Sequence, residues 1–151
     1  MSIVEFRPTG RFNPRNTELS LLGDLLQTPI RSSLNLAVLA QERVDADVVD
    51  RFRAHGLKAE ELLFIIHRRT LSRRRRNGER LSKDESDKAI RLARVVAQAE
   101  VVFGSREKAL TWLRGRKTKF AGKTALEMVT MEHGARLVEE ALTLIDEGYF
   151  A

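Results

Sequence analysis

Apolar residues recur along this chain at the three-and-four spacing typical of helices, and no segment keeps up the alternation that a strand requires. Residues 17–27, TELSLLGDLLQ, predict a short amphipathic helix that ends before Pro29. Residues 1–16 have no periodicity and are expected to form an extended arm. Further helices are expected at 33–44, 45–56, 58–66, 82–103, 105–115 and from 124 to the end. The pattern therefore predicts an all-α protein.

Segment 82–103 predicts a central helix. It opens with Ser82-Lys-Asp-Glu85, a capping box in which the side chains of Ser82 and Glu85 each accept a hydrogen bond from the other's backbone amide. Apolar residues then cover most of the circumference, and the polar residues fall mostly on one narrow stripe. A helix of this kind is buried on several sides. We interpret it as the core of a C-terminal domain, as a homodimer interface, or as both.

The end of the chain shows a second capping box. Thr124 and Glu127 form it, after a basic loop at residues 116–123. Trp112, in the helix before this loop, is interpreted as core packing. The final helix is expected to bury residues at three-and-four spacing, namely Leu137, Val138, Ala141, Leu142 and Ile145.

Length and composition indicate a soluble protein with a core of its own. Of 151 residues, 42% are hydrophobic, enough for one domain or two small ones. The absence of cysteine excludes disulfides and thiolate metal sites. The longest apolar run is 62–66, against the roughly 20 residues of a membrane span. The first residues hold no apolar signal-peptide core, so we expect a cytoplasmic protein without membrane contact.

Charge is concentrated in one segment. Residues 67–80, HRRTLSRRRRNGER, hold seven arginines and one glutamate and carry the whole net charge of +6. The segments before and after it are close to neutral. A patch this concentrated attracts a polyanion or an acidic surface.

Residues 58–80 predict a helix-turn-helix unit, with a tight turn at 67–69 and the arginines on the second helix. Leu71 is the apolar anchor that would hold this second helix against the first. Arginine suits the position because its planar guanidinium can contact guanine bases and can also neutralise phosphates. Successive residues point about 100° apart on a helix, so some arginines must hold phosphate. The expected DNA-binding residues are Arg68, Arg69, Thr70, Ser72, Arg73, Arg74, Arg75 and Arg76.

No motif indicates an enzyme. Gly122-Lys123-Thr124 ends like a phosphate-binding loop, but the first glycine of that motif would fall at Lys117, and no strand precedes it. The histidines have no metal-ligand spacing and are interpreted as surface or capping residues, namely His55, His67 and His133. We therefore expect no catalytic residue, no cofactor and no metal ion.

Four motifs stand out in the C-terminal half: LSKDESD at 81–87, EVVFGSREKALTWL at 100–113, GKTALE at 122–127 and GARLVEEALTLIDEGYFA at 134–151. Together with RRTLSRR at 68–74, they resemble the Xre/MbcA/ParS-type antitoxins of RES/Xre toxin-antitoxin operons, over residues 58–151. The chain departs from the family at His67 and Ala125, where proline is usual. Loss of the second proline removes a favourable first helical residue but leaves the capping box intact.

The resemblance implies a division of labour. Residues 33–80 would form an Xre/Cro-like DNA-binding domain after an arm and short helix at 1–32, and 81–151 would bind the toxin and dimerise. Antitoxins of this family cover the active-site entrance of an NAD-depleting RES-domain toxin, and they bind operator DNA to repress their own operon. The implied toxin-binding residues are Lys119, Phe120, Gly122, Lys123, Thr124, Gly148, Tyr149, Phe150 and Ala151.

Alternatives stay open at this point. Tyr149 and Phe150 could fold back on the protein's own core. The chain could be a plain helix-turn-helix regulator whose C-terminal domain only dimerises, or a scaffold that binds RNA or another polyanion through its arginines. The arginines could also form a solvated helix face or a surface for an acidic partner. An adjoining reading frame for a RES-domain toxin would favour the antitoxin.

Overall fold

The computed structural model describes residues 14–148, and the regular structure in this range is helical. The one β-type pairing among these residues is an isolated bridge between Arg116 and Thr124. The predicted all-α fold is confirmed. The helices are α1 (Pro14–Leu26), α2 (Ser33–Glu42), α3 (Val48–Ala54), the 3₁₀ helix η3 (Ala59–Leu62), α4 (Arg68–Arg76), α5 (Lys83–Phe103), α6 (Arg106–Arg114), the 3₁₀ helix η4 (Thr118–Phe120), α7 (Ala125–Val129) and α8 (Glu132–Asp146).

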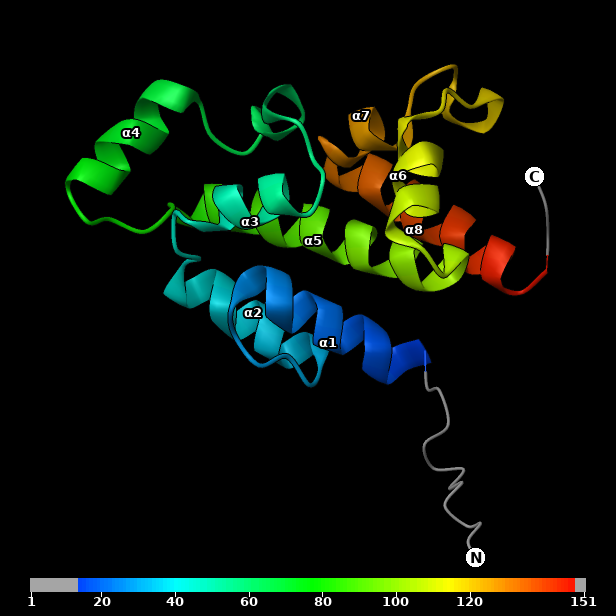
Figure 1. Cartoon of the computed structure of the whole chain (residues 1–151), viewed down its shortest axis with the longest axis horizontal. Helices are drawn as coiled ribbons and strands as arrows, with labels where there is room; N and C mark the ends of the chain where they lie inside the picture. The colour runs from blue at the N-terminus through cyan, green and yellow to red at the C-terminus, as the bar shows by residue number, and fades with distance from the viewer. Residues whose placement is uncertain (1–13, 149–151) are drawn as a thin grey trace, which may run out of the picture.

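α5 is the central helix, and α1, α2, α6, α7 and α8 all contact it (Figure 1). It begins with the predicted capping box of Ser82 and Glu85 and ends at Gly104 in the left-handed conformation. Its buried residues are Ser86, Ala89, Ile90, Leu92, Ala93, Val95, Val96, Ala97 and Ala99. The chain's own helices cover these faces, and the homodimer interface expected along this helix stays a prediction.

The predicted helix at 58–66 is only a 3₁₀ turn at Ala59–Leu62. Its backbone bonds join residues three apart, from Glu61 N to Lys58 O and from Ile65 N to Leu62 O. The Phe-Ile-Ile run at 64–66 has weak helix propensity because branched and aromatic side chains lose rotamer freedom in a helix. Burial of Leu62 and Ile65 in the core then determines the local path.

The end of the chain follows the predicted pattern except at two residues. Thr124 and Glu127 form the second capping box as predicted. α8 buries Val138, Ala141 and Leu142, but Leu137 is 46% exposed and Ile145 half-buried. Leu137 lies about 100° from Val138 around the helix, outside the buried arc.

α7 and α8 approach each other closely at Gly134. A Cβ atom on this residue would lie 2.0 Å from the carbonyl oxygen of Met128, so no other residue fits without a shift of the backbone. No helix of residues 14–148 has the length and apolar character needed to cross a bilayer.

Candidate functional site

The arginine-rich helix α4 stands apart from the body at one end of the molecule (Figure 1). Residues 45–80, which carry α4, leave the body of the protein and return to it at the same junction. There Leu81 N donates to Val44 O at 2.9 Å, and Val44 N donates to Ser86 Oγ at 2.8 Å. Ser86 is fully buried, so this polar contact is shielded from water.

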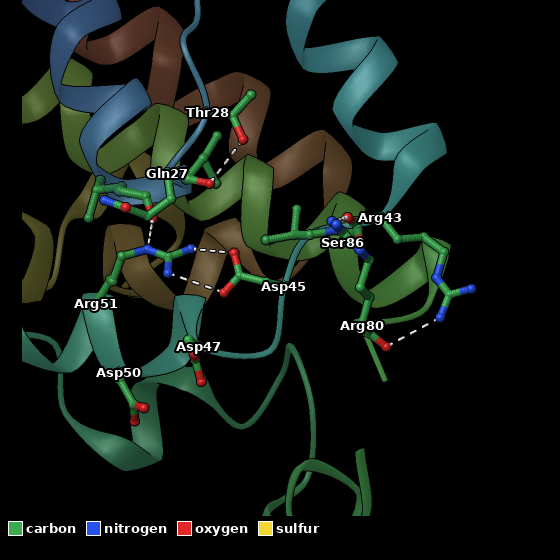
Figure 2. A network of polar contacts seen from close by, with 12 residues as sticks. Gln27, Thr28, Arg43, Asp45, Asp47, Asp50, Arg51, Arg80 and Ser86 are labelled. Carbon is green, nitrogen blue, oxygen red and sulfur yellow. Dashed lines mark hydrogen bonds and ion pairs between the residues drawn. The ribbon is translucent and has the colours of Figure 1, made fainter. Parts of the chain in front are cut away.

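Arginine side chains reinforce this junction, as Figure 2 shows. Arg43 Nε donates to Leu81 O at 2.8 Å, and Arg80 donates to Arg43 O at 2.9 Å. Arg51 forms a bidentate pair with Asp45, at 2.8 and 3.1 Å, and also donates to the carbonyl oxygen at the end of α1. The base of this 45–80 segment is therefore held to both α1 and α5. Sequence reasoning missed these contacts, since only the LSKDESD motif draws attention to Ser86.

Two of the predicted DNA-binding arginines hold α4 in place. Arg74 forms a bidentate pair with Glu85 at the start of α5, with both distances 3.1 Å. Arg75 lies 3.0 Å from Asp50 of α3. With Leu71, which packs against the core, they occupy positions i, i+3 and i+4 on the inward side of the helix.

The opposite side of α4 carries what we term the cationic stripe, Arg69, Ser72, Arg73 and Arg76, at positions i, i+3, i+4 and i+7. All four are exposed. Within the described range 14–148, none of their side chains has a hydrogen-bond or ion-pair partner. Arg68 is also exposed at the first turn, and Thr70 is half-buried.

The pairing of Arg74 with Glu85 shifts the pKa values of both side chains. Burial alone would raise the pKa of the Glu85 carboxyl, but hydrogen bonds from Ser82 N and from the Arg74 guanidinium outweigh it and lower that pKa. The hydrogen bond to Glu85 raises the pKa of Arg74. Glu85 thus caps α5 and orients α4 at the same time.

The predicted toxin-binding loop lies at the other end of the molecule (Figure 1). Phe120 is 3% exposed, and its ring meets Trp112 edge-on, with centroids 6.3 Å apart. Lys117 Nζ lies 4.3 Å from the centre of the Trp112 ring and donates to the carbonyl oxygens of Trp112 and Gly115. Burial, with a further contribution from Lys119, lowers the pKa of Lys117. Phe120 and Lys117 are therefore committed to the protein's own core.

Other predicted residues of this loop are exposed: Lys119, Gly122 and Lys123. Thr124 is half-buried and caps α7. A pocket of about 390 Å³, lined by Trp112, Arg116, Lys117, Thr118, Lys119 and Ile145, joins the loop to the last turn of α8. The structure thus brings the loop close to Ile145, and Gly148, three residues further on, is exposed. Tyr149, Phe150 and Ala151 lie outside the described residues.

Side chains also tie the helix-turn-helix unit to the second half of the chain. Arg114 on α6 forms a bidentate pair with Glu61, at 2.8 and 2.9 Å, and donates to Gly56 O at 2.8 Å. His55 is the C-cap residue of α3, in line with the predicted capping role, and its side chain also lies 2.6 Å from Glu100. These partners are far apart in the sequence, and no local pattern reveals them.

The fold and these surfaces are those of a protein with a helical DNA-binding domain followed by a second helical domain. Residues 36–94 match a family model described as the antitoxin Xre-like helix-turn-helix domain. Residues 98–148 match the antitoxin Xre/MbcA/ParS C-terminal toxin-binding domain. The junction between the two matches falls inside α5. The domain limits predicted after residues 32 and 80 stay a prediction.

A curated relative supports the same family. An antitoxin Xre from Pseudomonas putida is 45% identical over 85 residues, which cover 56% of this chain and 54% of the relative. The alignment thus spans about half of each protein. Two successive parts of the chain, 36–94 and 98–148, thus match the two domains of Xre/MbcA/ParS-type antitoxins.

Proposed function

We propose that this protein is an antitoxin with two separate binding surfaces, one for operator DNA and one for a RES-domain toxin that depletes NAD. It acts by binding and carries out no catalysis. The observation that carries the proposal is the position of the cationic stripe, exposed at one end of the molecule, while the family's toxin-binding domain lies at the other (Figure 1).

For DNA, α4 is the recognition helix. Arg69, Arg73 and Arg76 point outward over about two turns, a length of about 10 Å that fits within a major groove. Arg74 and Arg75 orient the helix through their acidic partners instead of touching DNA. Helix-turn-helix proteins read paired half-sites about 34 Å apart, so the DNA-bound form is a homodimer.

For the toxin, Lys119 of the loop and Ile145 near the end of α8 line the same pocket beside Trp112, and Lys123 is exposed on the same loop. The exposed lysines supply positive charge, and the last residues of the chain cover the active-site entrance of the toxin. Phe120 supports the loop from inside, because its ring is buried.

The deciding experiment is co-expression with a RES-domain toxin, taken from the adjoining reading frame if that frame encodes one. We expect the two proteins to co-purify, cells to keep normal NAD and to grow, and a reporter behind the operon's promoter to be repressed. Repression without any complex with the toxin would identify a plain helix-turn-helix regulator. A complex without repression would remove the DNA-binding half of the proposal.

A further inference from the structure

The side of α8 that faces away from the core is uncovered within the described range 14–148. It carries two apolar residues, Leu137 at 46% and Leu144 at 44% exposure. Two exposed glutamates, Glu140 and Glu147, lie with them at positions i, i+3, i+7 and i+10, within an arc of about 80° around the helix. Neither carboxylate has an ion-pair or hydrogen-bond partner among the described residues. We term these four residues the outer face of α8.

A groove of about 640 Å³ runs beside this face. It is lined by Arg94 of α5 and by residues of α8, namely Arg136, Glu139, Glu140, Thr143 and Leu144. Single exposed apolar side chains are ordinary, whereas apolar residues beside a groove with a polar rim indicate a binding surface. Two residues of the outer face, Glu140 and Leu144, belong to the groove as well. The two features therefore form one surface.

The chain before α1 starts next to this surface. α1 begins at the same end of the molecule at which α8 ends (Figure 1). Burial raises the pKa of Glu18 on α1, and the carboxylates of Glu139 and Asp146 on α8 raise it further. Residues 1–13 precede α1, and an extended chain of that length reaches about 40 Å, whereas α8 is about 22 Å long. That segment can therefore run along the whole of α8.

The sequence of residues 1–13, MSIVEFRPTGRFN, complements the outer face. It contains two aromatic residues that each adjoin an arginine, Phe6 with Arg7 and Phe12 with Arg11. The outer face offers the counterpart twice over, an exposed leucine followed three residues later by a glutamate. Apolar side chains gain free energy when they leave water, and arginine pairs with carboxylates.

Other occupants fit this surface less well. Both charged residues of the outer face are glutamates, so a second copy of α8 packed about a two-fold axis would bring like charges together. DNA is repelled for the same reason. A segment that combines aromatic residues with arginines matches both properties of the face.

We infer that residues 1–13 bind the outer face of α8 within the same chain. The two phenylalanines cover the exposed leucines, and the two arginines pair with the free glutamates. Burial of apolar area supplies most of the affinity, since exposed ion pairs add little, and the charges fix the position of the segment. The proposed binding of DNA and toxin does not use residues 1–13, so failure of this contact would leave the proposed function in place.

The test measures proximity in the full chain by nuclear magnetic resonance. The chain has no cysteine, so Thr9→Cys provides a single attachment site for a nitroxide spin label between the two arginines. A nitroxide broadens the signals of nearby nuclei. We expect the amide signals of residues 137–147 to lose most of their intensity, while those of α4, at the other end of the molecule, keep theirs. The same sample with the nitroxide reduced is the reference.

Charge reversal tests the specificity of the contact. Glu140→Arg with Glu147→Arg restores the α8 signals, because like charges then repel. Addition of Arg7→Glu and Arg11→Glu brings the broadening back, because the pairs re-form with opposite sign. The matched control is Glu60→Arg with Glu107→Arg, which reverses two exposed glutamates elsewhere and leaves the broadening unchanged. Circular dichroism verifies that all variants fold.

Three results would overturn the inference. Signals of α8 that stay intact in the free chain, and change only when toxin is added, would assign the face to the toxin. Broadening that persists after both α8 glutamates are reversed would show that the contact is not specific. Equal broadening in an isotope-labelled, cysteine-free chain mixed with unlabelled spin-labelled chain would place the segment on a second copy instead.

Discussion

Two basic segments of this chain, α4 and the loop at 116–124, differ in how far their side chains are exposed. α4 projects from the body, and its outward arginines have no partner within the described part of the chain. The loop folds back on the protein: Lys117 lies over Trp112, and Phe120 is buried beneath it. Basic residues in a sequence therefore indicate where a charged surface can form, but neighbouring groups determine which of the charges a partner can reach.

Neighbouring acidic residues likewise determine which arginines of α4 a partner can reach. Glu85 holds Arg74 in a largely buried pair, Asp50 forms a more exposed pair with Arg75, and the outward arginines stay free. In the loop, the nearest acidic partner is Glu127, 3.6 Å from Arg116 in a pair that is 50 to 71% exposed. Such an exposed pair adds little stability.

The largest expected effect comes from the cationic stripe. Replacement of Arg69, Arg73 and Arg76 by Gln removes the outward charge, and we expect operator binding to be lost at physiological salt. The slope of log affinity against log salt falls by about 0.9 for each phosphate contact removed. Anisotropy titrations at several salt concentrations measure both. The matched control is Lys119→Gln with Lys123→Gln at the other end, and an equal loss there would show that net charge alone drives DNA binding.

The second prediction concerns toxin neutralisation, at the end of the molecule opposite to α4. Deletion of residues 148–151 removes the end of the chain and spares the buried Val138 and Leu142. We expect operator binding to be unchanged, while cells that express the toxin lose protection and their NAD falls. Full protection with normal NAD would make the loop at Lys119 and Lys123 the main contact. Loss of helical signal would show that the tail belongs to the core.

The close packing of α7 against α8 depends on Gly134. Gly134→Ala forces a methyl group against Met128 O, so α7 and α8 move apart at a cost of about 1–3 kcal/mol in unfolding free energy. Urea denaturation measures this loss. Gly115→Ala is the control, because a Cβ there meets nothing closer than 3.4 Å. Equal stability of the two variants would show that the helices adjust freely.

The smallest effect concerns the anchor of α4. Glu85→Gln weakens the bond to Arg74, and we expect a loss of about 1–2 kcal/mol at neutral pH. The folded-state pKa of Glu85 is lowered, so its contribution is present above the unfolded value of 4.5 and is lost as the pH falls through the folded value. Thermal unfolding between pH 7 and about pH 3 tests this, since the variant loses less stability on acidification. An unchanged pH profile would contradict the assigned pairing.

Local chemistry determined much of this protein in the sequence itself. The capping boxes at Ser82 and Thr124, and the left-handed Gly104, lie where the residue types require them. Each depends on atoms within three or four residues, so the local sequence is enough to predict it. The all-α fold, the buried α5 and the position of the arginine cluster follow from periodicity and charge in the same way. Family motifs then indicated the antitoxin.

Only the tertiary structure decided which side of each helix is available. Arg73 and Arg74 are adjacent and chemically identical, yet one faces outward and the other binds Glu85, because α4 docks on the start of α5. Phe120 is core because Trp112 lies beneath the loop. The 58–66 segment forms a 3₁₀ turn because long-range burial outweighs its weak local preference. Such contacts join residues up to 58 positions apart, as in the hydrogen bond from Arg114 to Gly56 O, and no periodicity in the sequence encodes them.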